Sequence, residues 1–464
     1  MSDPTAPRAG ALVLFGITGD LARKMLLPAL YQLARRGALT EPVVGVTRGG
    51  WTLDRLRRHA HDAVAAQGPV DEDAFTRFSG LLRLATIDYD DPGSFRSIAE
   101  QTAGCGHLAH YLAIPPVLYA RAATCLAGAG LNENARLVVE KPFGHDLVSA
   151  RELQSELTKY FPEERLRRVD HFLGKDVVED LLTFRFANTL MRAVLDRHHV
   201  RSVQVTMAED FDVADRGGFY DAVGCLRDVV QNHLLQTLAY FVMEAPRSGS
   251  AADTLTERAR ALKAVRTVRP EDYVRGRYAG YLDTEGVKPD STTETYAALR
   301  TYVDTDRWSG VPFTIRAGKD METTSTEIVV ELDRPVPGHH HTQGAQTAGP
   351  NLVRFRLMPR SGVTFSLLAQ HGGDGTLLDE VTVTTDFTRL TGSDTSAYEH
   401  ILEDSLTGDP RRFCRMDMVE ECWRIVGGLL TSEGKPVVYR PGSWGPAEAD
   451  RLVTDERWFP LENV

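Results

Sequence analysis

The residues best suited to acid–base chemistry stand in one short stretch, DHFLGK at 170–175, which follows an expected strand. The side chains of His171 and Lys175 could pair with a phosphate dianion. Asp170 points the other way along an extended chain, so its carboxylate can serve a different partner. The alternative interpretation of the same residues is a helix-capping aspartate followed by an incidental histidine and lysine.

A second group of polar residues interrupts an otherwise apolar helix that we expect over 223–243. Asp228, Asn232 and Gln236 stand four residues apart, and His233 lies beside them. A polar stripe on a buried helix costs free energy unless it is hydrogen-bonded or used. A single histidine there would normally belong to the core, but the neighbouring polar row favours a site, and an imidazole titrates near neutral pH.

A third candidate is Lys141, in the segment EKPFG at 140–144, where an apolar strand is expected to end. A lysine at the carboxyl end of a parallel strand points into the crevice where α/β proteins bind ligands. The bond from Lys141 to Pro142 is a candidate for the cis form, because X-Pro bonds have only a small trans preference. The alternative is a solvated lysine before a turn.

The elements that must position these groups begin with an alternation of strands and helices. The segments 10–16 and 42–47 are apolar and flank a helical pattern, in which Pro28 predicts a kink. Further strands are expected at 81–87, 108–114 and 136–140, with helical stretches near 52–66 and 71–80. This alternation predicts a doubly wound α/β domain of parallel strands.

The turn after the first strand carries small residues at a GxxGxxA spacing, Gly16, Gly19 and Ala22. Small residues let the backbone approach a pyrophosphate, and the helix N-terminus attracts its charge. A tight turn without a ligand is the alternative, because the spacing departs from GxGxxG. No acidic residue follows the second strand to bind a ribose. Arg48 stands there instead, and favours NADP through its 2′-phosphate unless it is only a surface arginine.

The second part of the chain has a different pattern. After helical stretches, strand-like segments predominate with no long helix between them, which predicts antiparallel pairing. We therefore expect a dinucleotide-binding domain over 1–170 and an α+β domain over 171–464. The Pro- and Gly-rich segment 333–350 is expected to be a surface loop, and its histidines 339–341 are a solvated run rather than a metal site. The expected strands are 200–207, 294–302, 327–332, 352–358, 363–369 and 379–386, and the helices 176–197, 253–264, 396–407 and 415–430.

Composition excludes several classes of protein. The chain has 464 residues and a net charge of −11, which argues against wrapping nucleic acid. It shows neither an apolar run of membrane-spanning length nor a signal-peptide pattern. Its five cysteines are never at CxxC spacing, so we expect no disulfide framework and no structural zinc. A reduced, cytoplasmic protein is the expectation.

Seven segments taken together resemble the glucose-6-phosphate dehydrogenase family. They stand in the family's order and span nearly the whole chain, and DHFLGK and RDVVQNHLLQ are the most specific. The resemblance implies an N-terminal Rossmann-type domain, a C-terminal α+β domain with a large, mostly antiparallel sheet, and a homodimer or homotetramer built largely through that sheet. The segments are GITGDLA (16–22), YLAIPP (111–116), EKPFG (140–144), RVDHFLGK (168–175), RGGFYDAVGCLRDVVQNHLLQ (216–236), VPFTIRAGK (311–319) and YRPGSWGPAEAD (439–450).

The resemblance also implies an activity and roles for residues. The activity is the oxidation of D-glucose 6-phosphate to 6-phospho-D-glucono-1,5-lactone with NADP⁺, the first step of the oxidative pentose phosphate pathway, without a metal. His233 is then the general base and Asp170 the carboxylate that orients it. The remaining implied residues are, for the phosphate, His171 and Lys175; for the sugar hydroxyls, Lys141, Glu209, Asp228 and Lys319; and for the cofactor, Gly16, Gly19, Asp20, Leu21, Arg23, Arg48 and Lys141.

Four positions depart from the family's pattern. Phe172 replaces a tyrosine, Arg23 a lysine and Met358 a glutamine, and no basic residue follows Lys319 by a few positions. Each lost hydrogen bond costs about 1–3 kcal/mol if its partner stays buried, so we expect weaker binding of glucose 6-phosphate.

Three other functions are weighed. The first is the dehydrogenation of a related sugar phosphate, and the second is a non-catalytic dinucleotide-binding paralogue. The third is a metal-dependent hydrolase, which the absence of an HxH or HxxxH pattern disfavours.

Overall fold

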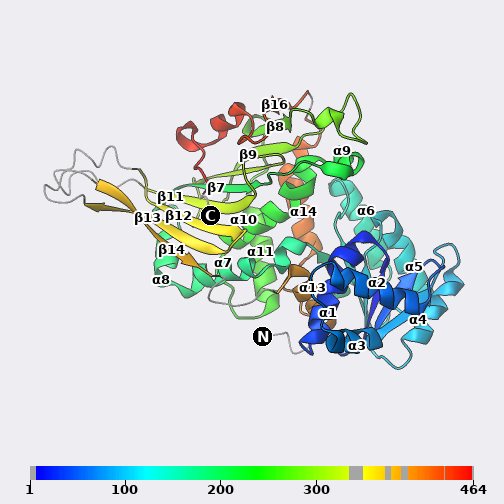
Figure 1. Cartoon of the computed structure of the whole chain (residues 1–464). Helices are drawn as coiled ribbons and strands as arrows, with labels where there is room; N and C mark the ends of the chain where they lie inside the picture. Colours follow the sequence, from blue (N-terminus) through cyan, green and yellow to red (C-terminus); the bar gives the residue numbers. More distant parts are fainter. Residues whose placement is uncertain (1–6, 334–348, 371–377, 388–394, 433, 462–464) are drawn as a thin grey trace. The chain divides into compact units, whose positions relative to one another are not determined.

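The computed structural model describes residues 7–333, 349–370, 378–387, 395–432 and 434–461 (Figure 1). Most of the predicted surface loop, including the histidine run, lies outside the described residues. No helix within the described part of the chain has the length and hydropathy to cross a bilayer.

The chain divides into two compact units. The first combines residues 1–176 with 246–257 and 394–420, and the second combines the remaining segments. The domain boundary at residue 170 stays a prediction, because compactness by itself is no test of independent folding.

The first unit is built on a seven-stranded sheet in the order β15-β6-β5-β4-β1-β2-β3. All neighbours pair in parallel except β15, which is antiparallel to β6. The predicted doubly wound α/β architecture is therefore confirmed. The strands are β1 Ala11–Phe15, β2 Val43–Thr47, β3 Leu82–Thr86, β4 Leu108–Leu112, β5 Ala135–Glu140, β6 Leu166–Val169 and β15 Phe413–Cys414.

Helices cover both faces of this sheet because its strands are apolar on both faces. In β1, Leu12 and Leu14 belong to one apolar cluster, whereas Val13 and Phe15 belong to the other. The first cluster includes side chains of α1 Leu27–Arg35, α2 Leu53–Ala65, α3 Glu72–Leu81 and α13 Ala397–Thr407, and the second those of α4 Arg96–Gln101, α5 Tyr119–Gly128 and α6 Leu147–Thr158.

The irregularity predicted at Pro28 lies at the start of the first helix. A π-helical turn, η1 (Ala22–Leu26), precedes α1, and Pro28 occupies the first turn of α1. Leu26 and Leu27 have helical φ and ψ and the Leu27 N–H donates to the Ala22 carbonyl, so η1 runs into α1 without a break. Pro28, which has no N–H, therefore directly follows a π-helical turn.

The second unit is built on a nine-stranded sheet in the order β14-β13-β12-β11-β7-β10-β9-β8-β16. Its pairs are antiparallel except β7 with β10 and β8 with β16, so the predicted mostly antiparallel sheet is confirmed. The strands are β7 Val200–Ala208, β8 Tyr273–Tyr278, β9 Tyr296–Tyr302, β10 Pro312–Gly318, β11 Ser325–Leu332, β12 Leu352–Met358, β13 Gly362–Gln370, β14 Leu378–Asp386 and β16 Val437–Tyr439.

Helices pack on one face of this sheet through aromatic side chains. Phe355 of β12 has ring centroids 5.4 Å from Phe184 and 5.7 Å from Phe241. These partners lie in α7 (Asp176–Ala187) and α10 (Leu235–Val242). The longer helices not yet named are α8 Thr189–Val194, α9 Gly217–Cys225, η7 Leu226–Leu234, α11 Ala251–Ala264 and α14 Met416–Val426.

Candidate functional site

The turn after β1 needs glycine for steric reasons. Gly16 has a φ of 75°, and an added Cβ would lie 2.2 Å from the carbonyl oxygen of Ala113. The Gly19 N–H donates to the Gly16 carbonyl at 2.9 Å, and an added Cβ at Gly19 would meet only that oxygen, at 3.2 Å. Asp20 is exposed and Leu21 is the N-cap of η1. The turn therefore offers a close backbone approach beside a helix N-terminus, as the sequence predicts.

Arg48 directly follows β2 and is exposed, and Arg23 is exposed in η1. Gly49 and Gly50 come next, with φ values of 113° and 71°. Within the described ranges, no carboxylate lies within ion-pair distance of Arg48 or Arg23. A cation at the carboxyl end of β2 and a second one in the helical turn η1 suit a phosphorylated ligand.

The end of β5 holds a buried acid. The Tyr111 hydroxyl donates to the Glu140 carboxylate at 2.6 Å, and the Tyr119 hydroxyl donates to the Glu140 carbonyl at 2.9 Å. Burial raises the pKa of Glu140 to about 7, against the opposing effects of Tyr111 and Lys141. Lys141 follows, half-buried, and its bond to Pro142 is cis, as predicted.

The end of β6 carries the predicted acid–base residues. Asp170, 2% exposed, caps the turn η5 (His171–Gly174) by accepting a hydrogen bond from the Phe172 N–H at 3.0 Å. The His171 ring stacks on Tyr398 of α13, with centroids 6.2 Å apart and planes 9° from parallel. The ammonium of Lys175 lies 4.6 Å from the centre of the Phe172 ring. Phe172 thus lacks a hydroxyl but still contacts the lysine expected to hold a phosphate.

The helix expected over 223–243 is interrupted once, at Gly224 near the end of α9, which has a non-helical φ of 71° and ψ of 168°. From residue 226 it runs without a break from η7, a π-helix, into α10, and the π-helical turn changes the predicted polar row. In a π-helix, residues five apart are about one turn apart, so Asp228 and His233 share a face more nearly than an α-helix allows. Gln236 does not belong to this face: it accepts a hydrogen bond from buried Arg258 at 2.7 Å and lies in the core.

Glu209 and Lys319 meet at the ends of the parallel pair β7 and β10. The Lys319 ammonium lies 2.7 Å from the Glu209 carboxylate and 4.5 Å from the centre of the Phe211 ring. The Glu209 N–H donates to the Gly318 carbonyl at 3.1 Å, which fixes the two strand ends together. Opposite charges at one sheet edge suit the hydroxyls of a sugar.

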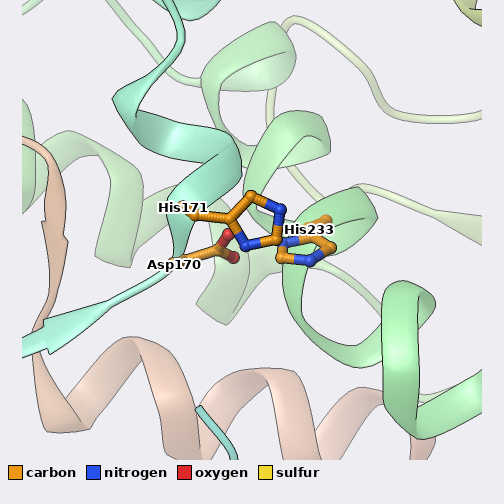
Figure 2. Close-up of side chains that lie close together, drawn as sticks. All are labelled: Asp170, His171 and His233. Atoms are coloured by element: carbon orange, nitrogen blue, oxygen red, sulfur yellow. The ribbon is translucent and has the colours of Figure 1, made fainter. Parts of the chain in front are cut away.

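Asp170, His171 and His233 lie close together, and Figure 2 shows the carboxylate beside the two imidazoles. One nitrogen or oxygen atom of each lies within 4.8 Å of those of the other two. Asp170 and His233 are buried, at 2% and 3% exposed. A buried imidazole beside a carboxylate is an arrangement for accepting and holding a proton.

Comparison with known proteins places the chain. Residues 13–180 match the NAD binding domain of glucose-6-phosphate dehydrogenase, and residues 182–459 match its C-terminal domain. The chain belongs to the glucose-6-phosphate dehydrogenase family. It is 41% identical to glucose-6-phosphate 1-dehydrogenase 1 of Mycobacterium tuberculosis, over 99% of both chains. It is 33% identical to glucose-6-phosphate 1-dehydrogenase of Aggregatibacter actinomycetemcomitans, over 95% of both.

Two solved structures of glucose-6-phosphate dehydrogenases are similar over nearly the full chain. The enzyme from Mycobacterium avium superimposes with a TM-score of 0.91 at 42% identity, covering 98% of this chain and 100% of that one. A second, in complex with its substrate glucose-6-phosphate, gives a TM-score of 0.90 at 30% identity, covering 99% and 100%. The sequence-based resemblance to this family is confirmed.

Two residues beside the candidate site residues were not singled out from the sequence. Tyr398 stacks on His171, and Phe211 lies against Lys319. The one available signal was the capping box at Ser396 and Glu399, which fixes the start of α13. Nothing in the sequence indicated that Phe211 lies beside Lys319, because tertiary packing alone brings the two together.

Proposed function

We propose that this chain oxidises D-glucose 6-phosphate at C1 to 6-phospho-D-glucono-1,5-lactone with NADP⁺, the first step of the oxidative pentose phosphate pathway. The observation that carries the proposal is the cluster of Asp170 and His233 in a chain of this family. One similar structure holds glucose-6-phosphate as its substrate.

In the proposed mechanism, His233 accepts the proton of the C1 hydroxyl, and the C1–O bond becomes the lactone carbonyl. The Asp170 carboxylate stabilises the imidazolium that forms and orients the ring. When bound, NADP⁺ supplies the acceptor for the hydride that leaves C1. Both side chains are buried, so their mutual attraction is poorly screened by water.

The substrate is held by charged groups that surround this pair in the proposal. His171 and Lys175 bind the 6-phosphate, supported by the rings of Tyr398 and Phe172. The sugar hydroxyls contact Lys141, Glu209, Asp228 and Lys319. These side chains offer both donors and acceptors, as an uncharged polyol requires.

The cofactor proposed is NADP⁺. The turn at Gly16 and Gly19, with the N-terminus of η1, fits a pyrophosphate, and Asp20, Leu21 and Arg23 belong to the same turn. Arg48 would bind the 2′-phosphate, since the residues after β2 include no acid that would select the ribose hydroxyls of NAD.

The proposal is tested by measuring NADPH and NADH formation with a panel of hexose phosphates. Glucose 6-phosphate with NADP⁺ is expected to give the highest kcat/KM. A higher value with another hexose phosphate would reassign the substrate, and no turnover with any of them would favour a non-catalytic paralogue.

A metal-dependent reaction is the second candidate, because the cluster in Figure 2 offers one carboxylate and two imidazole ligands. Zn²⁺ accepts this donor set. Activity after dialysis against a chelator separates the two functions: full activity supports the dehydrogenase mechanism without metal, and loss restored by a divalent cation supports the alternative.

Two further features are proposed from the family and the structure: a homodimer or homotetramer, and a cytoplasmic location. The oligomer is supported by β14, whose side chains from 379 to 385 are all exposed, including Val381 at 41% and Val383 at 53%. An uncovered edge strand with valines suits an interface between copies of the chain. Light scattering after size-exclusion chromatography gives the mass of the assembly.

The proposed cytoplasmic location is supported by the five cysteines, which are all free thiols.

A further inference from the structure

Arg55 occupies an unfavourable position that the fold nevertheless fixes. It lies in the first turn of α2, where Thr52 is the N-cap and accepts a hydrogen bond from the Arg55 N–H at 3.2 Å. A cation in the first helical turn opposes the helix dipole. A residue that breaks a local rule in this way is a candidate for function.

Two contacts fold the Arg55 side chain back toward the end of β2. Its Nη1 donates to the Gly50 carbonyl at 2.8 Å, and its guanidinium lies 4.3 Å from the centre of the Trp51 ring. The other guanidinium N–H groups have no hydrogen-bond partner among the described residues, and no carboxylate there lies within ion-pair distance. An arginine fork is therefore held in place with an edge available for a ligand.

The charges of Arg23 and Arg55 both act on the imidazole of His59, whose ring meets Trp51 edge-on at 5.2 Å. Burial is the largest cause of the lowered pKa of His59; Arg23 and Arg55 lower it further, and Asp62 opposes them. Arg48 precedes the two glycines that lead to Trp51, and these glycines supply no side-chain donors. Arg55 is hydrogen-bonded to Gly50 of the loop that follows Arg48, so it is a candidate partner for an anion at Arg48, beside Arg23 of η1.

We propose that Arg55 is a second residue that recognises the 2′-phosphate of NADP⁺, acting with Arg48, and that Trp51 positions its guanidinium. This inference rests on the proposed use of NADP⁺. It adds a specificity-determining residue that lies on α2 rather than at the end of β2. Bidentate contact of a guanidinium with a phosphate provides both charge and geometry.

The test is calorimetric titration with 2′,5′-ADP and, separately, with 5′-AMP, which differs from it only in lacking the 2′-phosphate. Arg55→Ala should weaken the binding of 2′,5′-ADP about tenfold and that of 5′-AMP less than about twofold, as loss of one charge-assisted contact predicts. Arg55→Lys should give an intermediate loss because it keeps the charge but not the fork. Trp51→Leu should also weaken the binding of 2′,5′-ADP more than that of the nucleotide without the 2′-phosphate, but the loss of affinity should be smaller than for Arg55→Ala.

Arg58→Ala is the matched control, because Arg58 is an exposed arginine of the same helix. If Arg55→Ala and Arg58→Ala lose the same affinity for 2′,5′-ADP, the effect is one of general charge and the proposal is wrong. The proposal is also wrong if Arg55→Ala weakens the binding of both nucleotides equally. If wild-type protein binds the two nucleotides equally, the use of NADP⁺ itself fails. If Arg48→Ala alone loses selectivity, NADP⁺ stands and the role of Arg55 falls.

Discussion

At the scale of single residues, the buried imidazole of His233 is the group on which the proposed chemistry depends. His233→Asn keeps a polar side chain of similar size but removes the base, so kcat should fall about 10²- to 10⁴-fold while KM for glucose 6-phosphate changes little. Steady-state kinetics measure both constants, and a thermal melt shows whether the variant is folded. A folded variant with near-normal turnover would contradict the assignment.

Glu140 predicts a pH dependence of stability. Its pKa is raised by burial from 4.5 to about 7, so between these values the folded state binds more protons than the unfolded state. The free energy of unfolding therefore falls as pH rises through this window, by about 3 kcal/mol in total. Glu140→Gln cannot titrate but still accepts from Tyr111, so it should lose this dependence.

Thermal unfolding of both proteins at pH 5 and pH 8 checks the Glu140 prediction. The wild type should lose more stability than Glu140→Gln between the two pH values. An unchanged difference in melting temperature between the two proteins would contradict it.

How far single residues can be predicted depends on how far apart their partners lie in the sequence. Asp170 and His233 were predicted from local motifs, and the structure brings them close together. Their roles remain predictions. Tyr398 and Arg55 escaped prediction, because a ring stacked on His171 and a guanidinium folded onto Trp51 are products of tertiary packing. No periodicity or spacing in the sequence records such contacts.

At the scale of elements, the two glycines of the strand–turn–helix at residues 11–26 are expected to have different roles, one in backbone conformation and one in ligand contact. Gly16→Ala should lower the melting temperature, because its φ is positive and its Cβ would collide with the Ala113 carbonyl. Gly19→Ala should lower the melting temperature much less, since its Cβ would meet only the Gly16 carbonyl oxygen, at 3.2 Å rather than 2.2 Å. It should nevertheless weaken the dinucleotide by obstructing the backbone approach.

Calorimetric binding of NADP⁺ and thermal melts of the two glycine variants give the comparison. Equal loss of stability in both would show that the turn is purely structural. Tight binding by Gly19→Ala would show that the pyrophosphate lies elsewhere.

Most elements were predictable because their hydrophobic period is regular. The alternation in the first part predicted the parallel strands, and the strand expected before Asp170 is β6, although two of its four residues are arginines. The two-residue strand β15 was not expected, because so short a segment has no period. The π-helix η7 was read as an α-helix, since apolar positions alone do not distinguish the two periods over nine residues. That difference is what brings Asp228 and His233 toward one face.

At the scale of the whole molecule, the first unit depends on a segment far along the chain. Ile401 and Leu402 of α13 are fully buried in the cluster that contains Leu12 and Leu14 of β1. β15 extends the same sheet by pairing with β6. A domain boundary drawn at one sequence position cannot predict that α13 and β15 belong to the first unit, because an amphipathic helix pattern does not indicate which sheet the helix covers.

This arrangement predicts which strands lose local stability when a core side chain is truncated. Leu402→Ala removes a fully buried side chain of the first unit, and Leu299→Ala removes one from β9 in the second. Each should cost about 2–5 kcal/mol. Hydrogen exchange should then accelerate mainly in β1, β2 and β4 for Leu402→Ala, and mainly in β8, β9 and β10 for Leu299→Ala, because local stability follows the packed unit rather than sequence distance. Acceleration spread evenly over both sheets in either variant would show that the units unfold as one, and would remove the basis for treating residues 1–170 as a separate domain.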